Sequence, residues 1–343
     1  MTKKAKKAQK PLVKTKRKIR NLQEFMDWFK KTGSMILLNI LRYALILCIG
    51  YIILLPLLEM ISTAFMSPEE VGSPVSEWIP SEFSVEHIVV AFKLLNYRSA
   101  VLYTLLTTAG QVVLQIFSAA ITGYAFARVR SKKIQAMFAI VILTIVVPQS
   151  VMVLPQYIYF SNFDVLGIIE AITGKPLNLI GEPAVLYLLD FCGMGLKSGL
   201  YIYIFRQFFR GLPKELEEAA HMDGCGFIRT LFTIVMPNAT PGIITVGVLS
   251  FVWNWNDTFY TNRFVGSQLN LMVRLSKASG AMDQFMNGLK NIPAGYYFST
   301  KDPLYQASIL STASLLVILP LIILYMFIQK KFVESASNSG IVG

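Results

Sequence analysis

The chain has 343 residues, of which 54% are apolar and 15% are charged, and its formal net charge is +12. A soluble domain usually carries about 25% charged residues, so this composition excludes a disordered chain and an ordinary water-soluble enzyme. Cys48, Cys192 and Cys225 are too few and too scattered for a disulfide framework. The chain has two histidines, His87 and His221, which are far apart in the sequence. The cysteines and histidines together provide almost no ligands for a metal site or a haem.

Long apolar runs indicate membrane-spanning helices, each of which needs about 20 mostly apolar residues. Four runs contain no charged residue, the first is interrupted only by Glu59, and the fourth contains Asp190 and Lys197. The six predicted spans are 43–65, 99–127, 134–163, 183–205, 230–256 and 303–329. We therefore expect an all-α, polytopic membrane protein with six transmembrane helices. We expect no cleaved secretory signal, because the first apolar run starts late and lacks a cleavage-like end.

The positions of the basic residues predict the orientation of these spans. With the N-terminus inside, 22 of the 32 Lys and Arg residues fall in cytoplasmic segments and 8 in external ones. Cytoplasmic segments of membrane proteins are enriched in Lys and Arg, so both termini are expected in the cytoplasm. The charge of +12 is then a topology signal together with a basic tail that faces anionic lipid, rather than a sign of nucleic-acid binding.

In chain order, four regions are expected. The first, 1–34, combines a basic tail that is disordered over 3–20 with an amphipathic helix carrying Leu22, Phe25, Met26 and Phe29. That helix either lies on the inner membrane face or simply leads into the first span. The second region, 35–98, contains the first span and an external loop. The third, 99–330, contains five helices, with a cytoplasmic loop at 206–236 and an external loop at 257–302. The fourth is the cytoplasmic tail, 331–343.

Several kinds of chemistry are excluded by missing residues. Gly174-Lys175 is followed by Pro176 and lacks the upstream glycine of a phosphate-binding loop. Two histidines cannot supply a clustered catalytic set, so we expect no enzyme activity. An ion-coupled secondary transporter needs ionisable groups deep in the membrane, and only Asp190 and Lys197 are candidates. If the protein moves a solute against a gradient, the energy is expected to come from another subunit.

The cytoplasmic loop between the fourth and fifth spans carries the most informative pattern. Pro213 suits the first position of a helix, three glutamates follow it, and Gly224 suits the stop. The pattern predicts a helix over 213–223 and a second helical segment over 227–236 that reaches Pro237 and continues into the fifth span. Two short helices joined by a glycine would form a compact knob.

This loop resembles a known signature. Glu218-Ala219-Ala220, three residues, Gly224, nine residues, Ile234, one residue and Met236-Pro237 are similar to the E-A-A-x3-G-x9-I-x-L-P motif of bacterial ATP-binding-cassette importer permeases. Asp223 also fits, and Met236 replaces the usual leucine. The resemblance implies a type I importer permease fold, with the loop seated on an ATPase. The residues to which it gives an ATPase-coupling role are Glu218, Ala219, Ala220, Asp223, Gly224, Ile234 and Pro237.

Other segments are similar to carbohydrate importer permeases, specifically the maltose-type second permease subunit. They are Gly123–Arg128, Val147-Pro148-Gln149, Arg206–Arg210, Trp255-Asn256-Asp257 and the glycine-bearing end from Phe332 to Gly343. The C-terminal end departs from that family by its acidic Glu334 and by the lack of a basic residue before the last glycine. The resemblance implies import of a sugar or oligosaccharide, and a non-sugar solute of the same transporter class stays open.

The resemblance also implies the assembly and its location. The partners are a second homologous permease subunit, two ATP-binding-cassette ATPase subunits, an extracellular sugar-binding protein and membrane lipid, in the plasma membrane of a bacterium. ATP and Mg would be used by the ATPases, and this chain would carry no cofactor and no metal.

Candidate substrate contacts follow from polar and aromatic residues at the spans. Asp190 and Lys197 are seven residues apart, which on one helix face is about 10 Å, and they either touch sugar hydroxyls or pair structurally. Trp253, Trp255 and Asn256 either stack on and hydrogen-bond a sugar or anchor the helix at the membrane interface. The loop 261–303 mixes aromatic and amide residues, and either contacts the binding protein or packs as a lid.

Overall fold

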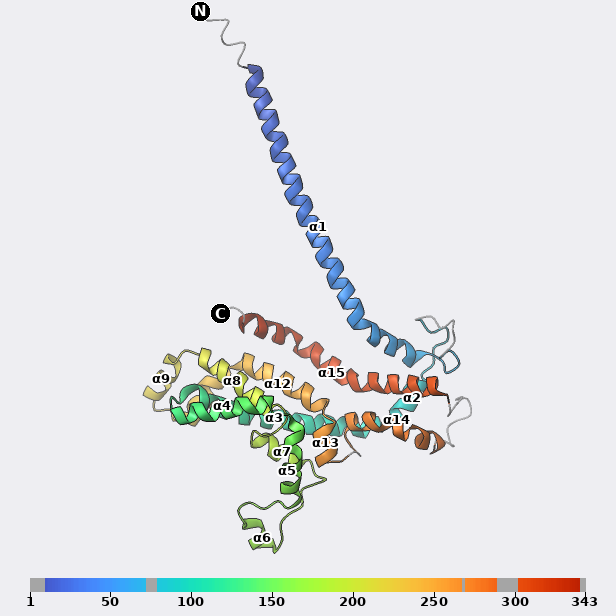
Figure 1. Ribbon diagram of the computed structural model, residues 1–343, viewed down its shortest axis with the longest axis vertical. Helices are drawn as coiled ribbons and strands as arrows, with labels where there is room; N and C mark the ends of the chain where they lie inside the picture. Colours follow the sequence, from blue (N-terminus) through green and yellow to red (C-terminus); the bar gives the residue numbers. More distant parts are fainter. Residues whose placement is uncertain (1–9, 72–78, 267–268, 289–301, 340–343) are drawn as a thin grey trace, which may run out of the picture. The chain divides into compact units, whose positions relative to one another are not determined.

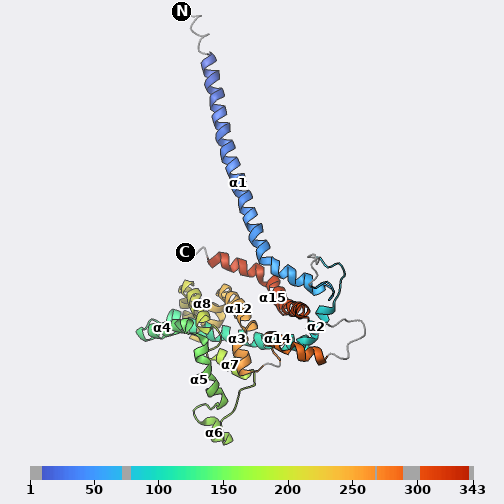
Figure 2. The same ribbon diagram turned by 45° about the vertical axis from the view of Figure 1, so that its right-hand side comes forward.

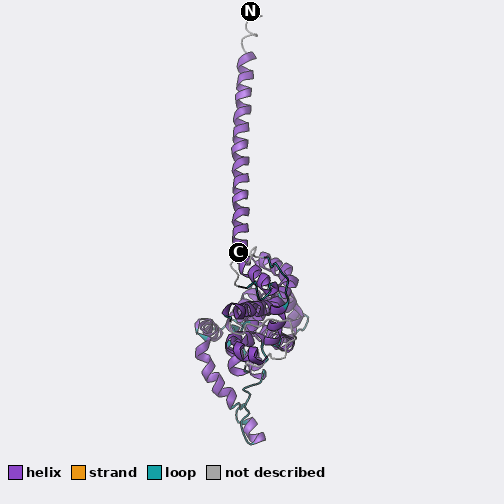
Figure 3. Cartoon of the chain, turned by 90° about the vertical axis from the view of Figure 1, so that its right-hand side faces the viewer, coloured by secondary structure: helices purple, strands orange, loops and turns teal. Residues whose placement is uncertain are grey.

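The computed structural model describes residues 10–71, 79–266, 269–288 and 302–339. All regular secondary-structure elements of these residues are helices (Figure 3). The chain divides into two compact units, Met1–Ile61 and Ser62–Gly343. The first unit consists of most of α1 (Lys10–Phe65), whose apolar part, Met35–Phe65, is long enough to cross a bilayer. Residues 10–20, expected to be disordered, are instead the start of this helix, and no separate amphipathic helix interrupts it.

The second unit contains the remaining elements. In chain order they are α2 (Glu86–Leu94), α3 (Tyr97–Arg128), α4 (Lys132–Val146), α5 (Gln149–Ser161), α6 (Ile168–Thr173), α7 (Ala184–Phe191), α8 (Ser198–Gly211), α9 (Glu215–Met222), α10 (Phe227–Thr230), the π-helical turn η1 (Leu231–Val235), α11 (Met236–Asn238), α12 (Thr240–Trp255), α13 (Phe259–Phe264), α14 (Leu271–Gly288) and α15 (Pro303–Ser339).

Three helices of the described residues are long and apolar enough to cross a membrane, and two bent pairs raise this number to as many as five. The straight ones are Met35–Phe65, Tyr97–Arg128 and Pro303–Lys330. The predicted third span is α4 and α5, bent by 104°, and the predicted fifth span is a helical segment and α12, bent by 82°. The predicted fourth span consists of α7 and α8, which are 8 and 14 residues long.

Proline residues explain the two bends. Pro148 lies between α4 and α5, and the residue before it, Val147, is extended with ψ of 125°. Steric clash with a proline ring disfavours helical backbone in the preceding residue, so the helix stops and restarts. The second bend falls at Ala239, between Pro237 and Pro241.

α3 is the centre of the bundle. It packs most extensively against α8 and also against α12 and α7, and these helices lie together in Figures 1 and 2. Buried Ala119, Ala120, Tyr201, Phe205 and Phe209 form the core between α3 and α8. α5 and α6 project away from this bundle (Figures 1 and 2).

A second core joins α2, α12, α14 and α15. Leu271 and Met282 of α14 are buried in it beside Tyr305 and Ile309 of α15. The predicted external loop at 257–302 therefore contains a helix that packs on the bundle, while 267–268 and 289–301 lie outside the described residues. At the other end of α15 the helix continues to Ser339, so much of the expected tail 331–343 is helical.

Candidate functional site

The predicted knob is formed by α9, a glycine turn and the helical segment after it. Gly224 has a φ of +79°, a conformation that residues with a Cβ rarely adopt. The Cys225 N–H donates to the Ala220 carbonyl at 2.9 Å, and the Gly224 N–H donates to the His221 carbonyl at 3.0 Å. These two bonds form a Schellman motif, which ends a helix by satisfying its last carbonyls. The predicted helix and its glycine stop are confirmed, but the helix spans Glu215–Met222 and begins two residues after Pro213.

The residues expected to couple to an ATPase divide between exposed and buried positions. Glu218, Ala219, Asp223 and Gly224 are exposed, whereas Ala220 is only 2% exposed. The small methyl group of Ala220 thus faces the protein, and the other four residues form an accessible surface. In Figure 1, α9 lies at one end of the bundle, where a partner could reach this surface.

An ion pair ties α9 to the C-terminal end of α3. Arg128 Nε and Nη2 lie 2.6 and 2.5 Å from Glu217 Oε1, and the Tyr124 hydroxyl donates to Glu217 Oε2 at 2.9 Å. Both charged side chains are 11% exposed. Arg128 Nη2 also donates to the Leu212 carbonyl at 3.3 Å, just before α9. One carboxylate thus accepts hydrogen bonds from two side chains of α3, so a displacement of α9 pulls directly on α3.

The segment after the glycine turn contributes to the same attachment. The Phe227 ring lies 4.7 Å from the Tyr124 ring, centroid to centroid. A π-helical turn follows, and such turns are frequent at functional positions. Ile234 is half-buried and Pro237 is exposed. The predicted second helical segment is confirmed, and it continues into the predicted fifth span through a bend at Ala239.

Asp190 belongs to a buried polar network in the bundle. Its side chain is 1% exposed, and Asp190 Oδ1 accepts from Gln115 Nε2 at 2.6 Å. The same nitrogen lies 3.1 Å from the Leu196 carbonyl, and Gln115 Oε1 accepts from Ser250 Oγ at 2.5 Å and from Asn254 Nδ2 at 3.0 Å. α3, α7 and α12 are therefore joined by hydrogen bonds where apolar spans offer few other polar partners.

The expectation that Asp190 and Lys197 share one helix face is wrong. α7 ends at Phe191, α8 begins at Ser198, and Lys197 between them has left-handed backbone with φ of 60°. Lys197 Nζ lies 4.6 Å from the centroid of the Trp253 ring, while Asp190 accepts from Gln115. Among the residues that the structure describes, no ion pair joins Asp190 and Lys197, so the structural pairing is wrong as well.

Glycines in this break allow close packing. A Cβ at Gly195 would overlap the Asp190 carboxylate. A Cβ on Gly199 would lie 2.5 Å from Thr144 Oγ1 and 3.1 Å from the Val141 carbonyl, so α8 approaches α4 closely.

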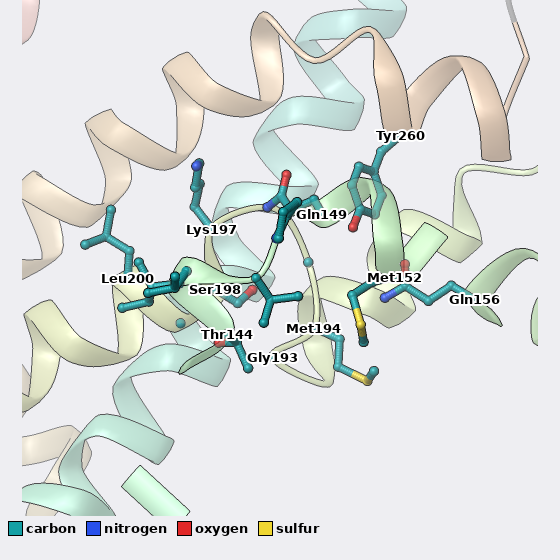
Figure 4. Close-up of a pocket in the computed structure, with 16 residues that line it drawn as sticks. Thr144, Gln149, Met152, Gln156, Gly193, Met194, Lys197, Ser198, Leu200 and Tyr260 are labelled. Carbon is teal, nitrogen blue, oxygen red and sulfur yellow. The ribbon is translucent and has the colours of Figure 1, made fainter. Parts of the chain in front are cut away.

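A cavity of about 440 Å³ lies where the α4–α5 and α7–α8 breaks meet. Its lining includes Lys197 and Ser198 from one break, Pro148 and Gln149 from the other, and Tyr260 from α13. In the view of Figure 4, Lys197 and Tyr260 lie on opposite sides of Gln149. Of the predicted substrate contacts, only Lys197 lines this cavity.

The other predicted contacts lie elsewhere. Trp255 is completely buried, and its indole N–H donates to the Val317 carbonyl at 3.3 Å, so it neither stacks on a ligand nor anchors at an interface. Asn256 is exposed and donates to the Val252 carbonyl at 2.8 Å. Trp253 is 44% exposed beside Lys197.

Within the described residues, no group of three or more His, Cys, Asp or Glu side chains could hold a metal ion. The three cysteines are free thiols.

The family model for the binding-protein-dependent transport system inner membrane component matches residues 115–337, well over half of the chain. The chain belongs to this family. The permease is therefore a multi-pass membrane subunit of an ATP-binding-cassette importer, which also contains a partner permease, an ATPase and a binding protein. Members of the family are transport subunits rather than enzymes, and nucleotide is used by the ATPases, so this permease has no cofactor of its own.

Individual relatives match nearly the whole permease. The melibiose/raffinose/stachyose import permease protein MelC of Bacillus subtilis (strain 168) is 24% identical over 315 residues, covering 91% of this chain and 99% of that protein. The diacetylchitobiose uptake system permease protein DasC of Streptomyces coelicolor is 24% identical over 300 residues, covering 88% and 95%. A chain in the crystal structure of a bacterial ABC transporter involved in the import of the acidic polysaccharide alginate matches with a TM-score of 0.63 at 19% identity, covering 86% of this chain and 96% of that chain. That likeness shows the permease fold.

Sequence reasoning missed the specific contacts that hold the permease together. Tyr124 and Arg128 were visible as a pair four residues apart, which share a helix face, but their partner Glu217 is 89 residues away from Arg128. Gln115 and Asn254 were visible as polar residues within apolar spans, and such residues usually face the interior of a helix bundle.

Proposed function

We propose that this permease moves a sugar or oligosaccharide into the cytoplasm of a bacterium, driven by ATP hydrolysis on separate ATPase subunits. The observation that carries the ATP-driven part is the exposed knob on α9, which is tied to α3 through Glu217 and Arg128. The sugar part is supported by MelC and DasC, which are import permeases for oligosaccharides and match this chain over about nine-tenths of its length.

The proposed assembly contains a second homologous permease subunit, two ATPase subunits and an extracellular sugar-binding protein. The exposed surface of Glu218, Ala219, Asp223 and Gly224 would seat in a cleft on one ATPase. ATP-driven closure of the ATPases would then move α9 and, through Glu217, α3. The transporter would thereby shift between inward-open and outward-open states, with the latter favoured by ATP and the loaded binding protein.

The proposed orientation places the coupling loop 206–236 and both termini in the cytoplasm. It is supported by the 22 basic residues of the inner segments. The basic region 1–34 would face anionic lipid of the plasma membrane, and the external loop 257–302 would lie on the side of the binding protein. Cys225 in the knob tests this: with Cys48 and Cys192 replaced by Ala, a membrane-impermeant maleimide should label Cys225 in inverted vesicles but not in intact cells.

Transport by the whole complex tests the function. The complex is purified through a tag on this permease, reconstituted into liposomes with its binding protein, and supplied with labelled melibiose, raffinose, diacetylchitobiose and acidic disaccharides. We expect uptake that requires ATP and is stimulated by the binding protein. Uptake driven by an ion gradient without ATP, or no uptake of any of these sugars, contradicts the proposal.

A further inference from the structure

The cavity between the two helix breaks has an unusual balance of charge. Among the described residues, Lys197 is the only charged one in its lining, which otherwise consists of apolar, amide and hydroxyl-bearing residues and glycines. The Lys197 ammonium lies over the Trp253 ring, which attracts a cation but carries no negative charge. Asp190, the nearest carboxylate by sequence, faces Gln115 instead. A lysine within the spans of a membrane protein is costly unless an opposite charge or a polar partner accompanies it.

Two helix N-termini add to this positive potential. α5 starts at Gln149 and α8 starts at Ser198, and both residues line the cavity. Neither N-terminus is capped by a side chain. The Ser198 N–H donates to the Gly195 carbonyl, so the contribution of these ends is the positive end of each helix dipole, which favours an anion. The C-terminal end of α4 also lines the cavity through Val146, and its carbonyls suit hydroxyl groups.

Two buried side chains in the lining lack hydrogen-bond partners. Ser198 and Gln156 are 5% and 7% exposed, and neither Ser198 Oγ nor Gln156 Oε1 has a partner among the described residues. Buried polar atoms are normally hydrogen-bonded, so both atoms are suited to a polar ligand. Tyr260 and Gln149 supply further groups around the same space, and a volume of about 440 Å³ lies within the ~300–1,000 Å³ range of small-molecule sites.

We propose that this cavity binds the carboxylate of an acidic sugar, a saccharide that contains uronic acid, with Lys197 as its counter-ion. The inference rests on the proposed function and narrows its substrate class. The flexible stem of Lys197 lets its ammonium turn from the Trp253 ring to the ligand, while the two N-termini stabilise the same negative charge. Ser198 and Gln156 bind the sugar hydroxyls. A neutral sugar would satisfy those polar atoms but would leave Lys197 without an opposite charge.

Uptake of acidic and neutral forms of one sugar tests the proposal. The complete complex with its binding protein is given labelled digalacturonate and dimannuronate, and the carboxyl-reduced form of each. We expect uptake of an acidic disaccharide to fall about 10-fold or more in Lys197→Met, since a hydrogen bond to a charged group is lost, and to persist in Lys197→Arg. Lys133→Met, an exposed lysine outside the cavity, is the matched control and should be unchanged. Ser198→Ala is a conservative change that should also lower uptake of the acidic disaccharide. It tests the site even if the Lys197→Met complex fails to assemble.

The outcomes separate this inference from the proposed function. ATP-dependent uptake of neutral sugars alone, or uptake of an acidic disaccharide that is unchanged in Lys197→Met and Ser198→Ala, overturns the acidic-sugar site and leaves sugar import intact. Absence of ATP-dependent uptake of any sugar, including the neutral oligosaccharides, overturns both.

Discussion

Replacing Glu217 by Gln removes the charge that attaches α9 to the end of α3. The carboxylate accepts from Arg128 at 2.6 Å and from Tyr124 at 2.9 Å, and the two charged side chains are 11% exposed. Removing one partner of a buried pair costs about 3–5 kcal/mol, because the other charge loses its counter-charge. Arg128 retains the Leu212 carbonyl and the new amide oxygen, so we expect about 3 kcal/mol, at the lower end of that range. This corresponds to about a 10²-fold loss in the ratio of attached to detached α9.

The expected phenotype is uncoupling. The Glu217→Gln complex should assemble and hydrolyse ATP, but move fewer sugar molecules per ATP than the wild type, because α9 no longer pulls on α3. Glu215→Gln, an exposed carboxylate in the same helical turn, is the matched control and should cost at most about 0.3–1 kcal/mol through the helix dipole. Uptake and phosphate release are measured on the same liposomes.

A charge swap isolates the pair from other effects of the change. Glu217→Arg with Arg128→Glu should recover part of the coupling that each single variant loses, because residues in direct contact have non-additive effects. If Glu217→Gln and Arg128→Met both transport as many sugar molecules per ATP as the wild type, the attachment of α9 through this pair plays no part in coupling.

Three further changes test other parts of the structure. Gly224→Val should abolish transport and binding-protein-stimulated ATP hydrolysis while the complex still inserts in the membrane, because a φ of +79° strains a β-branched residue; wild-type stimulation would contradict the coupling role of the knob. Gly195→Ala should lower the melting temperature of the complex, since its Cβ overlaps the Asp190 carboxylate, at a cost of about 1–3 kcal/mol typical of overpacking; an unchanged melting temperature would contradict this contact. Burial lowers the pKa of His87 in α2, so the unfolded chain takes up this proton first and stability falls as the pH drops through about 6.5. His87→Asn should flatten that fall, measured by melting from pH 8 to 5. Burial raises the pKa of the adjacent Glu86, which opposes the His87 effect nearer pH 4.5.

The knob was predictable because its signals are local. Pro213 and Gly224 bracket a short helix through their own backbone preferences, and the structure places α9 between them, with its start two residues after Pro213 and a Schellman motif at its end. Nothing in that argument depended on residues elsewhere in the chain.

The breaks in the spans were visible in the sequence but were outweighed by composition. Pro148 stands in an uncharged run, and the glycines around Gly195 stand in a run whose only charged residues are Asp190 and Lys197; both runs are long enough to cross a bilayer. Hydropathy reports only how apolar a run is, whereas proline and glycine decide whether it stays straight. The expectation for Asp190 and Lys197 failed for this reason, since a seven-residue spacing has meaning only within one continuous helix.

The polar contacts could not be predicted, because their partners come from distant parts of the chain. Gln115 lies 75 residues from Asp190 and 135 from Ser250. Local rules identify such residues as facing the bundle interior, but they do not pair them. The burial of Trp255 was missed in the same way, because its Val317 acceptor lies 62 residues further along.

These contacts connect the knob to the cavity through one helix. α3 runs unbroken from Tyr97 to Arg128, and Gln115 lies 13 residues before Arg128, about 20 Å along the axis at ~1.5 Å per residue. Gln115 in turn holds the Leu196 carbonyl, in the residue next to Lys197. Because α3 is continuous while α4–α5 and α7–α8 are broken, a pull on Arg128 moves Gln115 as part of a rigid helix and is absorbed at the breaks. Lys197 and Gln149 line the cavity at those breaks. The α4–α5 and α7–α8 breaks, which would change conformation when α3 moves, are therefore also the segments that would bind the solute.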